Sequence, residues 1–278
     1  MIDLLLAPFE PTFMTRALVG GLLVAAISAL VGVWIIVRGL TFLGEAMSHG
    51  MLPGVAIASL LGGNPMIGAG VAGLAMALGA QGLRRGRFFG QDTAIGVLYV
   101  GLLALGVIIV SRAQSFATDL TAFLFGDVLA IQWGDVFILT GALVVVALAS
   151  LLLYRPFLAL SIDARVAQTL GMRPRPAGIA MLVLLTITLA ASFHVVGTLL
   201  AFGMLVAPSA AAMLLAKRIP VAMLLAWLFG SIAVVGGLLL SWHASTAAGA
   251  SIAVVAVALF LLVALGRGVR SLSLERTR

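Results

Sequence analysis

Long apolar stretches recur along this chain, and they constrain its fold more than any other feature. Each is about 20 residues long, the length that a helix rising about 1.5 Å per residue needs to cross a bilayer. Hydrophobic residues make up 63% of the 278 residues and charged residues only 9%, against about 25% charged residues in a soluble domain. A soluble domain of this composition would lack the polar residues to cover its surface. We therefore predict an all-α, polytopic transmembrane helical bundle.

Nine stretches qualify as spans of about this length. Only a short turn around residues 194–197 separates the sixth from the seventh, so eight spans plus a half-helix is the alternative. Because no linker or low-complexity segment interrupts the chain, we expect residues 1–278 to form a single transmembrane domain. The predicted spans cover residues 16–37, 40–62, 65–83, 93–112, 133–154, 177–193, 197–216, 219–241 and 247–266.

The basic residues indicate how these spans are oriented, because cytoplasmic loops of membrane proteins are rich in Lys and Arg. Nine spans place the two termini on opposite sides. With the C-terminus in the cytoplasm, all of the 16 basic residues except Arg16 and Arg112 lie on the cytoplasmic side. The net charge of +7 is thus a topology signal, so we expect lipid around the chain and no nucleic-acid partner.

The second predicted span carries an acid and a histidine. Glu45 is the only acid well inside a span, and His49 follows four residues later, on the same helix face. Ionisable groups inside a membrane are costly and mark functional sites. A carboxylate and an imidazole on one face make half of a divalent transition-metal site, and two such helices across a two-fold axis would complete it. Because only a neutral imidazole ligates, acid should weaken metal binding there.

Other roles for Glu45 and His49 stay open on spacing alone. The two side chains can pair with each other as a structural link between helices, or they can form a proton relay in a secondary transporter. The chain contains no cysteine, which excludes thiolate metal ligands. Its single lysine, Lys217, is followed by Arg218 rather than Ser or Thr, so no Walker A motif is present and any ATPase must be another chain. We expect no permanently bound cofactor.

Small residues and a proline follow the same helix. Gly50 and Gly54 belong to a series of small residues at every fourth position, a pattern that lets another helix approach closely. Pro53 removes one backbone hydrogen bond near the middle of the span. A kinked and tightly packed helix with ionisable groups suits a moving gate. The alternative is tight packing without movement.

The longest predicted cytoplasmic loop covers residues 155–176. Within it, residues 162–171 can form a short helix that has Asp163 near its start and Gly171 as its terminator. A short amphipathic helix on the cytoplasmic face is a natural docking element. An ordinary connecting loop is the alternative.

Six runs of sequence resemble the permease subunits of bacterial zinc/manganese ABC importers. The first is Gly44–Ala56, which has Glu45 where the family usually has Asp, followed by the Ser-His and Leu-Pro-Gly-Val-Ala elements of the family pattern. The runs are collinear over residues 13–266. They are residues 44–56; 92–96; 124–129; 163–167 with 171; 196–200 with 207–211; and 237–241 with 246–250.

The resemblance implies a fold like that of type II ABC importer permeases, in the bacterial cytoplasmic membrane. It implies a homodimer that binds two cytoplasmic ATP-binding subunits and receives Zn²⁺ or Mn²⁺ from an extracytoplasmic metal-binding protein. The metal would contact Glu45 and His49. The ATPase-coupling residues would be Asp163, Arg165, Ala167 and Gly171. A proton-coupled secondary transporter that uses Glu45 and His49 as its relay is the alternative, and a membrane scaffold without transport is a third class.

Overall fold

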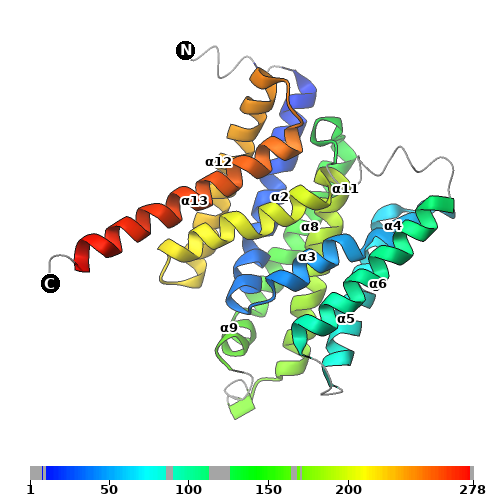
Figure 1. The fold of residues 1–278 in the computed structure, drawn as a ribbon, viewed down its shortest axis with the longest axis horizontal. Coiled ribbons are helices and arrows are strands. Elements are labelled where there is room, and N and C mark those ends of the chain that lie inside the picture. The colour runs from blue at the N-terminus through cyan, green and yellow to red at the C-terminus, as the bar shows by residue number, and fades with distance from the viewer. Residues whose placement is uncertain are drawn as a thin grey trace.

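The chain is described by a computed structural model that covers residues 8, 11–85, 90–112, 126–163, 168–169 and 171–275. All regular elements within these ranges are helical (Figure 1), as the sequence predicts. In chain order they are α2 (Thr12–Val37), α3 (Thr41–Gly50), α4 (Leu52–Leu60), α5 (Pro65–Arg85), α6 (Gln91–Arg112), η2 (Val128–Ala130), α8 (Trp133–Leu152), α9 (Tyr154–Ile162), α11 (Pro174–Leu215), α12 (Ile219–Ala244) and α13 (Ala248–Glu275).

Eight helical segments in the described residues are long and apolar enough to cross a bilayer. They correspond to eight of the nine predicted spans. The predicted span over residues 40–62 is instead divided into the shorter helices α3 and α4, because Pro53 lacks the N–H that would continue the hydrogen-bond ladder. Together the two helices cover that span.

The sixth and seventh predicted spans form one helical element, α11, that is interrupted at Gly197. This glycine has φ 73° and ψ 174°, a conformation open to glycine and not to residues with a Cβ. Figure 1 shows that the two limbs diverge from this point instead of forming one rod. The limbs, Pro174–Phe193 and Val195–Leu215, each qualify as a span, so the predicted division at residues 194–197 is confirmed.

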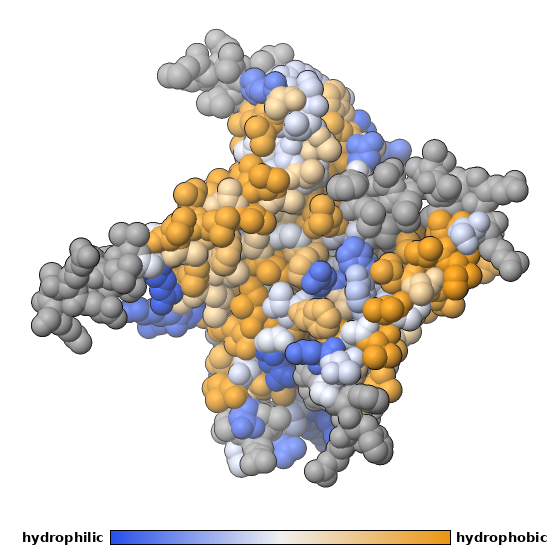
Figure 2. Space-filling model, in the orientation of Figure 1, coloured by the Kyte–Doolittle hydropathy of each residue, from blue (hydrophilic) through white to orange (hydrophobic). Residues whose placement is uncertain are grey.

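Helix α2 forms the centre of the bundle. It packs against α8, α11 and α12, and Ile27, Trp34 and Ile35 on it are almost fully buried. Figure 1 shows α3 to α6 on one side of α2, and α12 and α13 on the other. Large apolar side chains such as Val97, Leu151 and Leu262 are exposed instead, and Figure 2 shows hydrophobic residues over much of the visible face. An apolar surface of this kind matches a bilayer as solvent.

Two glycines allow α4 and α5 to cross at close range. A methyl group on Gly68 would overlap the carbonyl oxygen of Gly54 and lie 2.7 Å from the Cβ of Ala58. A methyl group on Gly54 would lie 2.6 Å from the Cβ of Ala72. The small-residue series predicted from the sequence therefore lies at this helix crossing.

Replacing Gly68 with alanine should destabilise the fold by about 1–3 kcal/mol, because backbone atoms of α4 would have to shift. The measurement is thermal unfolding of the purified chain in detergent. Gly70→Ala is the matched control on the same helix, since no atom lies within 4 Å of a Cβ at Gly70. An equal loss of stability in both variants would contradict the close crossing.

Candidate functional site

One face of α3 carries the predicted site. Phe42 and Glu45 are exposed on the protomer and His49 is half-buried, and their spacing of three and then four residues puts all three on one side of the helix. The intervening Leu43, Ala46 and Met47 are buried against the bundle. This α3 face, defined by Phe42, Glu45 and His49, is therefore the side of the helix that the protomer itself leaves uncovered.

The imidazole of His49 lies beside an aromatic ring from α6. The ring centroids of His49 and Tyr99 are 6.0 Å apart, with the planes inclined at 56°. The nearby hydroxyl of Ser48 donates to the carbonyl of Gly44 at 3.0 Å, so this buried polar group is satisfied within the helix. Tyr99 thus borders the site on one flank, a contribution that no sequence motif marked.

Hydrophilic residues gather over α3 in the middle of a mostly hydrophobic face (Figure 2). An exposed carboxylate at Glu45 would be costly against acyl chains, because charged groups inside a membrane face protein or a water-filled cavity. Among the described residues, no group of three or more His, Asp or Glu side chains is placed to hold a metal ion. One protomer therefore supplies at most a two-residue half-site on the α3 face.

The predicted gate residues lie where α3 gives way to α4. Helix α3 ends at Gly50 and α4 begins at Leu52, with Met51 in a near-helical conformation between them. Pro53 is buried in the first turn of α4, and Gly54 meets α5 there. The N–H of Met51 still bonds to the carbonyl of Met47, and the hydrogen-bond ladder is interrupted at Pro53, which has no N–H. Glu45 and His49 thus lie on a helix of 10 residues that ends just before this interruption.

The segment that the sequence predicts to be cytoplasmic and to couple to an ATPase contains a helix that the sequence did not predict. Helix α9 occupies Tyr154–Ile162, at the start of the predicted loop. After it, Asp163 is the C-cap of α9, with an extended backbone at φ −161° and ψ 141° and an N–H that bonds to the carbonyl of Ala159. Gly171 is exposed, and its φ of +71° fits the predicted terminator. Arg165 and Ala167 lie outside the described residues.

Two acids line an open pocket on the opposite side of the molecule from α9. Asp127 and Asp135 border it together with Gln132 and residues at the α11 kink. The carboxylate of Asp127 accepts from the backbone N–H of Leu129 at 3.2 Å, and that of Asp135 accepts from the N–H of Gln132 at 2.9 Å. Both carboxylates therefore cap the helices η2 and α8.

Several known proteins are similar to this chain over most of its length. The ABC 3 transport family matches residues 10–267. The manganese transport system membrane protein MntC of Halalkalibacterium halodurans is 36% identical over 251 residues, covering 90% of this chain and 86% of that protein. The manganese import system permease protein ScaB of Streptococcus parasanguinis is 37% identical, covering 90% and 89%. The chelated iron transport system membrane protein YfeD of Yersinia pestis is 30% identical, covering 95% and 89%.

Two solved structures share the fold. One is PsaBC from Streptococcus pneumoniae in complex with Fab, with a TM-score of 0.86, 35% sequence identity and 95% of each chain covered. The other is a metal-chelate type ABC transporter in an inward-facing conformation, with a TM-score of 0.74, 15% identity, and 91% of this chain and 86% of that chain covered. At this lower identity the likeness concerns the fold alone.

Proposed function

This chain belongs to the ABC 3 transport family, and on that premise we propose that it is the permease subunit of an ATP-driven importer of a divalent transition metal. The α3 face carries the proposal. It presents a carboxylate and an imidazole, Glu45 and His49, on a membrane helix whose other exposed groups are apolar. Both groups are ligands for divalent transition metals. The cation would therefore pause at the α3 face on its way across the membrane.

Mn²⁺ is the substrate that the comparisons favour. Two of the relatives described above are named for manganese and one for chelated iron. A carboxylate and imidazole set accepts Mn²⁺, Fe²⁺ and Zn²⁺ alike, and the availability of metals in the cell sets which one is carried. The expectation of Zn²⁺ rests on the sequence resemblance. Competition among the three ions during uptake measures which of them the transporter prefers.

A homodimer would complete the metal site, because one protomer supplies only part of the ligands. Each protomer supplies one carboxylate and one imidazole, too few for a saturated coordination shell. A second copy related by a two-fold axis would add the same pair and would cover the exposed Glu45, which lipid cannot solvate cheaply. We therefore place the α3 face at the dimer interface, around a central passage.

Energy would come from two cytoplasmic ATP-binding subunits, because this chain has no Walker A motif. They would dock on α9 and residues 163–171, where Leu158 and Ile162 expose apolar surface. An extracytoplasmic metal-binding protein would deliver the ion to the opposite side. In this arrangement residues 1–278 form one permease domain in the bacterial cytoplasmic membrane, with segment 155–176 and the C-terminus in the cytoplasm.

Replacing His49 with alanine should reduce ATP-dependent Mn²⁺ uptake by about tenfold or more, because even supporting residues of metal sites cost about 10–100-fold when removed. The assay uses proteoliposomes that contain this chain, its ATPase and its metal-binding protein. His243→Ala is the matched control, since His243 is exposed at the end of α12 and pairs with the carbonyl of Leu239. Uptake by the wild-type chain without nucleotide would instead favour a proton-coupled secondary transporter.

The charge at position 45 should matter more than the length of the side chain. Glu45→Gln removes the anionic ligand and should abolish uptake, whereas Glu45→Asp restores the usual family residue and should retain it. Uptake is measured with Mn²⁺, Fe²⁺ and Zn²⁺ for each variant. Equal uptake by Glu45→Gln and the wild-type chain would show that no carboxylate is needed at this position.

Because the chain has no cysteine, a single introduced cysteine reports on the dimer interface without background. Phe42→Cys on the α3 face should form a disulfide-linked dimer in native membranes under mild oxidation. Leu151→Cys is the control, since Leu151 is even more exposed than Phe42 and lies on α8, a helix without substantial packing against α3. Cross-linking at position 151 but not at 42 would place the interface elsewhere.

A further inference from the structure

Helix α9 packs against α8 and α11 and is also held at two points beside α2, of which the first is a buried aromatic cluster. Trp34 makes edge-to-face contacts with Tyr154 and with Phe157, each with ring centroids 5.6 Å apart. Trp34 and Phe157 are at most 1% exposed. Since α2 is the most buried of the spanning helices, this cluster gives α9 a fixed point of support near its N-terminal end.

The second point of attachment lies just beyond the end of α2. Arg38 extends from the turn between α2 and α3, and its guanidinium donates to the backbone carbonyl of Leu160. Leu160 is in the last turn of α9, where carbonyl oxygens lack partners within the helix and a cation is favoured by the helix dipole. Arg38 therefore connects the C-terminal end of α9 to the start of α3. Residues 163–171 follow directly after that end of α9 in the chain.

The turn that contains Arg38 is built as a corner. The N–H of Leu40 bonds to the carbonyl of Ile35, and that of Gly39 to the carbonyl of Ile36, as in a Schellman motif that ends a helix. Gly39 has a φ of +65°, and no atom lies within 4 Å of a Cβ built there. Helix α2 thus ends at this corner, and α3 begins two residues later without being a rigid extension of it.

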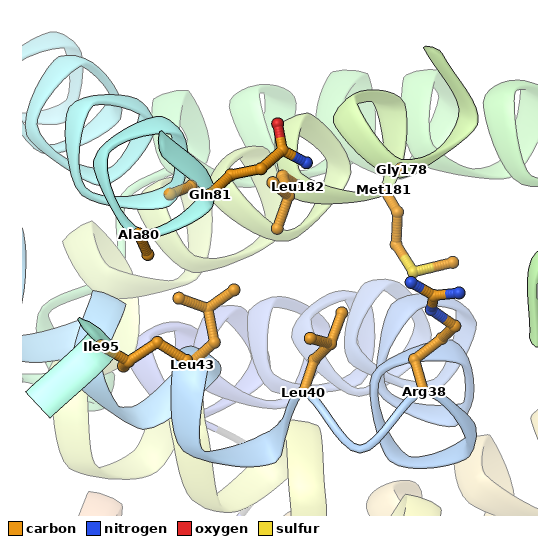
Figure 3. Close-up of a pocket in the computed structure, with 10 residues that line it drawn as sticks. Arg38, Leu40, Leu43, Ala80, Gln81, Ile95, Gly178, Met181 and Leu182 are labelled. Atoms are coloured by element: carbon orange, nitrogen blue, oxygen red, sulfur yellow. The ribbon is translucent and has the colours of Figure 1, made fainter. Parts of the chain in front are cut away.

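A cavity lies directly beside the first turn of α3. Its volume is about 60 Å³, several times the about 10–15 Å³ that a single water needs. Figure 3 shows Leu40, just before α3, and Leu43, in the first turn of α3, pointing into it, and Arg38 next to Met181 of α11 at one end. Because protein interiors are otherwise close-packed, this cavity is the place where the first turn of α3 can shift without displacing neighbouring atoms.

From these contacts we propose that Arg38 is the positioning residue that couples α9 to the metal-carrying helix. The aromatic cluster serves as the pivot, and the C-terminal end of α9 moves Arg38 and the first turn of α3 toward or away from the cavity. The break between α3 and α4 lets α3 move as a short unit, which changes the position of Glu45 and His49. This inference rests on the proposed function, because the ATPase must supply the movement of α9.

The test compares Arg38→Met with Arg38→Lys in the assembled complex in proteoliposomes. Arg38→Met removes the donors and should lower the amount of Mn²⁺ carried per ATP hydrolysed by about tenfold or more, within the range of allosteric couplings. Hydrolysis itself and assembly should persist. Arg38→Lys retains a charged donor and should recover most of the ratio. Arg16→Met is the matched control, since Arg16 is on α2 and bonds only locally, to the carbonyl of Thr12.

An unchanged ratio of Mn²⁺ transport to ATP hydrolysis in Arg38→Met would overturn the coupling role of Arg38. Absence of ATP-driven uptake by the wild-type complex would instead overturn the proposed importer function. A measurement without variants covers the case in which Arg38→Met does not assemble. Hydrogen exchange of the wild-type complex is compared with and without a non-hydrolysable ATP analogue. The amides of residues 39–44 should change their exchange together with those of α9. A change confined to α9 would overturn the coupling role of Arg38.

Discussion

A carboxylate placed on an uncovered face of a membrane helix is the constraint on which the rest of this structure depends. Lipid cannot solvate Glu45 cheaply, yet the protomer leaves it exposed. In the proposed homodimer, a second copy would cover this carboxylate and would complete a set of metal ligands at the same time. The apolar exterior of α5, α6, α8 and α13 would then face the bilayer, and the proposed passage would be confined to the α3 face.

Helix α3, which carries Glu45 and His49, is one of the shorter helices among the described residues, with 10 residues. A corner at Gly39 precedes α3 and a proline break follows it, while the close α4–α5 crossing holds the next segment in place. By contrast, α2 is a long helix that is buried along most of its length. In a transporter, the side of the membrane from which the site is reached must change, while the other helices keep their packing. A buried core helix beside a short site helix suits this requirement.

The sequence predicted the features that depend on composition and spacing. Apolar length located the spans, and the i, i+4 spacing of Glu45 and His49 placed them on one face. The features that it did not predict arise from tertiary packing. Helix α9 reads as a loop because it is only nine residues long and contains Pro156 near its start, and its contact with Trp34 is visible only in the folded chain. Likewise, the hydrogen bond from Arg38 to Leu160 joins residues 122 positions apart, and the proximity of Tyr99 to His49 depends on how α6 packs beside α3.

The most direct measurement is electron–nuclear hyperfine spectroscopy of Mn²⁺ trapped in the assembled complex, with the histidines of this chain labelled with ¹⁵N. Coordination at the α3 face predicts a nitrogen coupling from directly bound imidazole that disappears in His49→Ala and persists in His243→Ala. A bound ion that shows only water and carboxylate ligands in the wild-type complex, or a nitrogen coupling that survives loss of His49, would contradict the assignment of this helix face as the metal site.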